Sequence, residues 1–155
     1  MATYYFAYGA DMDSVELDLQ HDRRRRPRIR FVSSEPATLQ GYRLVSDITS
    51  RVRRGGIFNV IPDPTASVSG AVYELRAGDT ISVAVMKEGE IAKYELSLLP
   101  VKTHKGKVIS ALVLHAQPEK KQLKPTPDYL EIVIRAARKH KLPLEWIKYL
   151  QSLLK

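Results

Sequence analysis

The sequence contains no cysteine, which excludes disulfide bonds and metal sites built on thiolates. It also has no run of 18 apolar residues, so we expect no membrane-spanning helix and no membrane partner. The first nine residues lack the basic start and apolar length of a signal peptide, and we therefore expect a cytoplasmic protein. The 155 residues, 44% of them hydrophobic, fit one domain over residues 1–155 with a core of ordinary size.

Several sequence motifs of catalysis are missing as well. The four histidines are widely spaced, without the His-x-His or His-Glu-x-x-His spacing of a metal site. There is no Gly-x-x-x-x-Gly-Lys-Ser/Thr phosphate loop and no serine placed as in a nucleophile elbow. We therefore expect neither a metal ion nor nucleotide-dependent chemistry.

Positive charge is abundant and uneven. The net charge is +8, residues 101–155 carry twelve Lys and Arg against four Asp and Glu, and residues 23–30 hold six arginines. Such segments could bind nucleic acid, a membrane surface or an acidic small molecule. However, no aromatic residues interleave with the arginines, and no nucleic-acid-binding signature is present. A solvated surface is the better interpretation, although some of these arginines could pair with acidic residues or bind a substrate carboxylate.

Patterns typical of strands fill the first two thirds of the chain, and helical patterns close it. This order predicts the α+β class, without internal repeats or a domain boundary. The expected strands are residues 4–8, 37–46, 57–61, 69–75, 94–101 and 108–115. The expected helices are residues 14–20, 79–87, 128–140 and 143–154. We expect residues 62–64, which include two prolines, to end the strand that begins at residue 57.

The turn after the first strand is a candidate binding loop. An aromatic run ends at Tyr8, and Gly9, Ala10 and Asp11 follow before a probable helix. Successive backbone N–H groups in such a turn can converge on a carbonyl or carboxylate oxygen. A turn without a ligand would have the same sequence pattern, so this segment alone does not decide the function.

The segment Tyr5-Phe6-Ala7-Tyr8-Gly9-Ala10-Asp11 resembles the opening Tyr-Phe-Ala-Tyr-Gly-Ser-Asn motif of gamma-glutamylcyclotransferase-like proteins. Further segments that resemble this family follow in the same order over nearly the whole chain. They are residues 26–27, 37–44, 55–57, 61–62, 70–75, 88–89, 127–129 and 142–146. Each segment is short, and it is their order that makes the resemblance specific.

The resemblance implies a small mixed β-barrel with flanking helices, and it implies Glu88 as the catalytic carboxylate. It also implies a set of substrate-binding residues in the first turn and in two later segments. These are Tyr5, Phe6, Ala7, Tyr8, Gly9, Ala10, Asp11, Tyr94 and Tyr129. From residue types alone, the tyrosines could equally fill the core, and Glu88 could be an ordinary surface carboxylate.

Two departures from the family motif bear on the substrate. Ala10 and Asp11 stand where the family has serine and asparagine, so a hydroxyl is lost and a negative charge is gained. An Asp11 carboxylate facing the pocket would repel a substrate carboxylate and favour a cationic group.

The reaction that the resemblance implies is the cyclisation of a gamma-glutamyl amide to 5-oxoproline with release of an amine. Glu88 would act as general base and then as general acid, and no cofactor would be needed. The expected partner is a small gamma-glutamyl substrate, and the protein would be a monomer or a homodimer. The alternative is a catalytically inactive relative that acts as a basic module for binding nucleic acid or another ligand.

Overall fold

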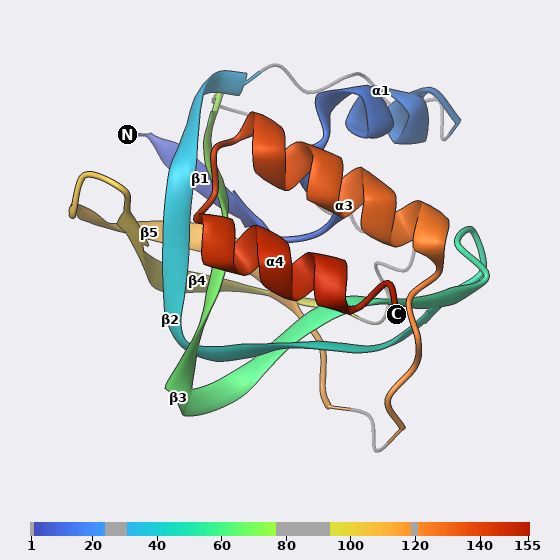
Figure 1. Cartoon of the computed structure of the whole chain (residues 1–155). Helices are drawn as coiled ribbons and strands as arrows, with labels where there is room; N and C mark the ends of the chain where they lie inside the picture. The colour runs from blue at the N-terminus through green and yellow to red at the C-terminus, as the bar shows by residue number, and fades with distance from the viewer. Residues whose placement is uncertain (1, 24–30, 77–93, 119–120) are drawn as a thin grey trace.

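The computed structural model of the chain describes residues 2–23, 31–76, 94–118 and 121–155. Five strands in this part of the chain close into a barrel in the order β1-β3-β2-β4-β5 (Figure 1). Their bounds are β1 (Thr3–Ala7), β2 (Phe31–Ser50), β3 (Gly55–Leu75), β4 (Glu95–Thr103) and β5 (Val108–His115). With the helices described below, the barrel confirms the predicted α+β class.

Strand β1 lies inside the sheet, as its nearly continuous apolar sequence predicts. It pairs antiparallel with β3, with Phe6 opposite Val72, and parallel with β5 through Tyr5 and Leu112, which makes the barrel mixed. The Phe6 side chain packs closely over β3. A β-carbon added at Gly70 would lie 2.7 Å from Phe6 Cζ, so this position requires glycine.

Strand β3 corrects one prediction from the sequence. Residues 57–61 and 69–75 were expected to be separate strands, but they belong to the single 21-residue strand β3. Its pairing with β2 shifts from Pro62 opposite Tyr42 to Ser67 opposite Gln40, so residues 63–66 bulge out opposite Gly41. Prolines are tolerated at such a bulge because no ladder hydrogen bond is required there. The strand therefore bends at this point and continues.

Helices flank the barrel, and the described ones are α1 (Ser14–Arg23), α3 (Pro127–Lys139), α4 (Leu144–Ser152) and a 3-10 turn, η1 (Ala10–Met12). Helix α3 begins at Thr126, whose hydroxyl accepts the Tyr129 N–H at 3.4 Å, and it buries an apolar stripe that includes Leu130 and Val133. Helices α3 and α4 run side by side over the barrel (Figure 1). Among the described residues, no helix is both long and apolar enough to cross a bilayer. The helix expected at residues 79–87 lies outside the described residues.

Candidate active site

The turn that follows β1 folds back on itself through the side chain of Asp11. The Tyr5 hydroxyl donates to Asp11 Oδ2, and the Gly9 N–H donates to Asp11 Oδ1 at 3.1 Å. Asp11 is only 3% exposed, and these two bonds satisfy both of its oxygens in a buried setting. The Gly9 N–H, which the sequence suggested as a donor to a ligand, therefore already has an acceptor within the turn.

The hydroxyls of three further tyrosines of the predicted site form hydrogen bonds with backbone groups near the same end of β1. The Tyr8 hydroxyl donates to the carbonyl of Leu114 on β5. The hydroxyls of Tyr94 and Tyr129 meet at Phe58: Tyr94 donates to its carbonyl at 3.1 Å, and Tyr129 accepts from its N–H at 3.2 Å. All three tyrosines are buried. The fold thus brings together residues that are more than a hundred positions apart in the sequence.

The electrostatics of these hydroxyls show that they form one cluster. Burial raises the pKa of Tyr5 well above its ordinary value, and the charge and hydrogen bond of Asp11 raise it further. Burial is also the main cause of the raised pKa of Tyr8 and Tyr94, and Tyr129 and Asp11 contribute to both. The hydroxyls of Tyr5, Tyr8 and Tyr94 therefore keep their protons at neutral pH and can act as hydrogen-bond donors.

Of the remaining predicted site residues, the structure describes Phe6, Ala7 and Ala10 but not Glu88. Phe6 and Ala7 are fully buried on β1, and Phe6 packs over Gly70. Ala10 lies in η1 and is also buried. Glu88 lies outside the described residues, so its role stays a prediction.

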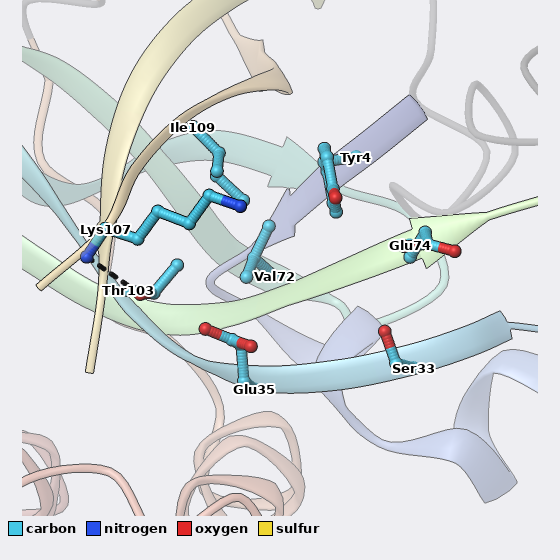
Figure 2. A pocket seen from close by; sticks show the side chains of 8 residues that line it. All are labelled: Tyr4, Ser33, Glu35, Val72, Glu74, Thr103, Lys107 and Ile109. Carbon is cyan, nitrogen blue, oxygen red and sulfur yellow. Dashed lines mark hydrogen bonds between the residues drawn. The ribbon is translucent and has the colours of Figure 1, made fainter. Parts of the chain in front are cut away.

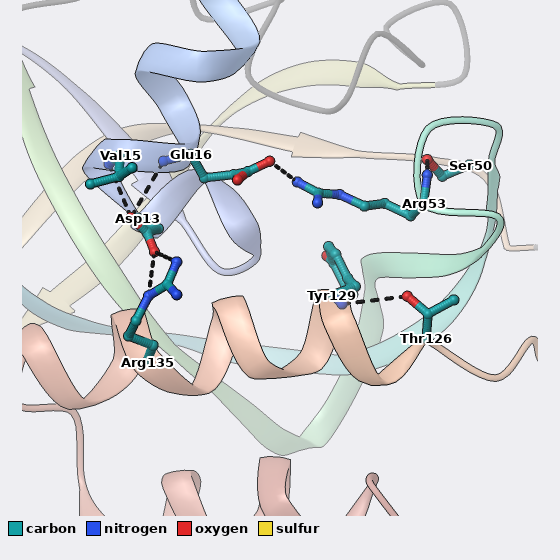
Figure 3. Close-up of polar contacts among 8 residues, drawn as sticks. All are labelled: Asp13, Val15, Glu16, Ser50, Arg53, Thr126, Tyr129 and Arg135. Carbon is teal, nitrogen blue, oxygen red and sulfur yellow. Dashed lines mark hydrogen bonds and ion pairs between the residues drawn. The ribbon is translucent and has the colours of Figure 1, made fainter.

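Two residues that the sequence analysis missed border the tyrosine cluster. Arg53, in the turn between β2 and β3, places its guanidinium carbon 5.9 Å from the centre of the Tyr129 ring (Figure 3). Its Nη2 atom forms an ion pair with Glu16 Oε1 on α1. Both side chains are nearly buried, with exposed fractions of 11% for Arg53 and 9% for Glu16. Only an arginine-rich turn was visible in the sequence, because the partner carboxylate is 37 residues away.

A second arginine–carboxylate pair joins α1 to α3. Asp13 Oδ1 accepts the Val15 N–H at 3.0 Å and caps α1, and Asp13 Oδ2 accepts Nη2 of Arg135 at 2.6 Å (Figure 3). Burial alone would raise the pKa of Asp13, but the hydrogen bonds from Arg135 and from the backbone at Glu16 and Val15 lower it below its ordinary value. This pair fixes the start of α1 next to the binding turn.

A small pocket of about 70 Å³ lies at the end of the barrel where β1 begins. All five strands and the turn between β4 and β5 contribute to it, through Tyr4, Ser33, Glu35, Val72, Glu74, Thr103, Lys107 and Ile109. Lys107 extends over the pocket, and Glu35 and Glu74 project from neighbouring strands (Figure 2). None of the predicted site residues that the structure describes is among its lining residues.

The sequence and fold were compared with known proteins. Residues 67–150, more than half of the chain, match the AIG2-like family. The chain belongs to the AIG2-like family.

Individual relatives of this AIG2-like protein are gamma-glutamylcyclotransferases. It is 27% identical over 153 residues to gamma-glutamylcyclotransferase of Bos taurus and 26% identical to that of Homo sapiens. Each alignment covers 96% of this chain and 77% of the relative. A solved gamma-glutamyl cyclotransferase structure shares the fold with a TM-score of 0.81 at 23% identity, covering 98% of this chain and 88% of its own. The resemblance stated from the sequence is confirmed: the AIG2-like chain is similar to gamma-glutamylcyclotransferases in both sequence and fold, which supports a gamma-glutamylcyclotransferase-like enzyme.

In the part of the chain that the structure describes, no three His, Asp or Glu side chains gather as a metal site would require.

Proposed function

We propose that this protein cyclises a gamma-glutamyl amide to 5-oxoproline and releases the amine. The observation that carries the proposal is the cluster of buried hydroxyls of Tyr5, Tyr8, Tyr94 and Tyr129 around the Asp11 turn. The names of the relatives supply the reaction class, and the low identity leaves the substrate to experiment. We also propose that it works in the cytoplasm on a small soluble substrate.

The reaction is intramolecular. The α-amine of the glutamyl group attacks its own side-chain amide carbonyl, forming a bond to the amide carbon and breaking the bond from that carbon to the leaving nitrogen. Holding the substrate in its folded conformer supplies much of the rate acceleration. The α-ammonium loses two protons as it becomes the ring N–H, and the leaving nitrogen gains two as it departs as an ammonium ion, so no net proton transfer to water is required. One of these protons must pass from the attacking nitrogen to the leaving nitrogen during the reaction itself.

Glu88 is proposed to carry that proton, as base in the first step and acid in the second. An ordinary glutamate, with a pKa of about 4.3, is a poor base for an amine with a pKa of about 8. A site near buried tyrosines would raise the pKa of a carboxylate through desolvation and bring the two values closer. The assignment to Glu88 comes from its position in the sequence motif.

The developing oxyanion needs hydrogen-bond donors. Because Asp11 already accepts the Gly9 N–H, the backbone N–H groups of Ala10 and Asp11 are the proposed donors in this turn. The tyrosine hydroxyl protons are not available for this role, because those of Tyr5, Tyr8 and Tyr94 already go to acceptors within the protein. This revises the expectation that successive N–H groups of the whole turn converge on one substrate oxygen.

The test is the release of 5-oxoproline by the parent and by Glu88→Gln. Glutamine keeps the shape of the side chain and removes the base, so we expect turnover to fall by at least about a hundredfold. The control is Glu95→Gln, at the exposed start of β4, which should keep the parent rate. The substrate panel should contain gamma-glutamyl amino acids, polyamines and lysine side chains. Turnover of any of these by Glu88→Gln at the parent rate would remove Glu88 from the mechanism.

A further inference from the structure

The turn that carries Arg53 is fixed directly to the start of helix α3. Gly56 donates its N–H to the carbonyl of Lys124 at 3.3 Å, and Leu123 donates to the carbonyl of Ser46 at 2.7 Å. A β-carbon added at Gly56 would lie 2.7 Å from Leu123 Cβ, so the two backbones touch. Tyr129 lies in the first turn of α3, a few residues further along. The positions of Arg53 and Tyr129 are therefore set by one packed unit.

The conformation of this turn directs Arg53 inward. The Arg53 N–H donates to Ser50 Oγ at 3.2 Å, and the next residue, Arg54, has a φ of 55°, a left-handed conformation that residues other than glycine rarely adopt. The Arg53 guanidinium consequently lies over the Tyr129 ring rather than in water. Burying an arginine–carboxylate pair has a large desolvation cost, and apolar residues would often fold as stably. A functional role for Arg53 would account for this cost.

Tyr129 connects Arg53 to the site. The hydroxyl of Tyr129 belongs to the cluster at Phe58, whereas its ring lies under Arg53. A substrate whose reacting end meets the hydroxyl cluster would extend its other end past this ring. The turn also carries Arg51 and Arg54, so three arginines lie close together in the sequence beside this ring. Of these, Arg53 contacts Tyr129, and a guanidinium suits a carboxylate because its planar fork can donate two parallel hydrogen bonds.

We propose that Arg53 is a specificity-determining residue that binds a carboxylate on the leaving amine of the substrate. Glu16 holds the guanidinium over Tyr129 when the site is empty and yields part of its contact to the substrate. The inference rests on the proposed function, since it concerns the leaving group of that reaction.

The experiment compares two substrates that differ only in this carboxylate, gamma-glutamylalanine and gamma-glutamylethylamide. In Arg53→Gln, kcat/KM for gamma-glutamylalanine should fall about tenfold to a hundredfold, the usual range for a lost hydrogen bond to a charged group. The loss should appear mainly in KM, and kcat/KM for the ethylamide should change by less than about twofold. Arg135→Gln is the matched control, because it removes an arginine from the neighbouring pair and should leave the ratio between the substrates unchanged.

Arg53→Gln leaves Glu16 without this partner and could unfold the protein, so the double variant Glu16→Gln/Arg53→Gln is measured in parallel. It removes both charges and should show the same loss of preference for gamma-glutamylalanine. If both substrates are affected equally, or neither is affected, Arg53 does not determine specificity.

Binding is also followed by the rise in Tm that each compound causes, because this readout does not depend on turnover. If the parent releases no 5-oxoproline but is stabilised by gamma-glutamylalanine, and the double variant is not, the proposed reaction fails and the Arg53 site stands. If the parent cyclises and binds both compounds equally well, the reaction stands and the Arg53 site fails. If neither compound is turned over or stabilises the parent, both proposals are overturned.

Discussion

Two arginine–carboxylate pairs lie one helical turn apart at the start of α1, and their surroundings differ (Figure 3). In the Asp13–Arg135 pair, the arginine side chain is 53% exposed, whereas the Asp13 side chain is buried and also caps the helix. In the Glu16–Arg53 pair, both partners are nearly buried and the arginine covers Tyr129. Solvent reaches the arginine of the first pair and weakens its attraction to Asp13, so this pair acts mainly as a local structural contact. The second pair bears a desolvation cost beside the candidate site, which is the setting expected for a selective contact.

The largest expected effect concerns the tyrosine cluster on the Glu16–Arg53 side, at alkaline pH. Burial raises the pKa of Tyr5, Tyr8 and Tyr94 in the folded protein, so the folded state holds protons that the unfolded state releases above about pH 10. The free energy of unfolding should stay constant as the pH approaches 10 and then decrease as the pH rises further. Each tyrosine contributes a slope of up to about 1.4 kcal/mol per pH unit.

Urea unfolding between pH 8 and pH 11.5 measures this slope, and tyrosinate absorbance reports ionisation in the folded protein. Tyr8→Phe removes one of the titrating hydroxyls and should make the slope shallower. If all eight tyrosines ionise near pH 10 while the protein is still folded, the cluster is not buried as described.

The next largest effect is the difference in unfolding free energy between variants of the two arginine–carboxylate pairs. Glu16→Gln leaves the nearly buried Arg53 without this carboxylate and should lower the free energy of unfolding by about 3 kcal/mol. Arg135→Gln removes one partner of the buried Asp13 carboxylate but leaves its backbone hydrogen bonds, so it should cost less, about 1–2 kcal/mol. The double variant Glu16→Gln/Arg53→Gln should recover part of the larger loss. Equal costs for the two single variants, measured by urea unfolding, would show that burial does not distinguish the pairs.

These two pairs also mark the limit of prediction from the sequence. The barrel strands and the closing helices follow from local periodicity. Tyr5, Tyr8 and Asp11 were indicated by one short motif, and Tyr94 and Tyr129 by later segments that resemble the same family. The Glu16–Arg53 pair could not be predicted, because its partners are 37 residues apart and meet only when the β2–β3 turn folds against α1. The continuous strand β3 was missed for a related reason: whether Pro62 ends a strand depends on the bulge opposite Gly41.

The turn of Asp11 is an intermediate case. Aspartate side chains often bond to backbone N–H groups close by in the sequence, so the contact with Gly9 had a recognisable local signal. The contact with Tyr5 depended on how the turn folds back over β1 and had no such signal. Local hydrogen-bonding rules therefore predict part of this site, and the remaining contacts depend on tertiary packing.

The smallest expected effect tests the Asp13–Arg135 pair at acid pH. Asp13→Asn keeps an oxygen to cap α1 but loses the charge that faces Arg135, so it should cost about 1 kcal/mol at pH 7. The hydrogen bonds hold the pKa of Asp13 below its ordinary value, so its charge contributes fully above about pH 4 and the contribution is lost as the pH falls through the lower, folded value. Parent and Asp13→Asn should therefore converge in urea unfolding between pH 7 and pH 2. Glu131→Gln, at an exposed position of α3, controls for the general loss of one negative charge and should differ little from the parent at either pH. A cost for Asp13→Asn that stays the same at pH 2 would mean that Asp13 acts through packing and capping alone.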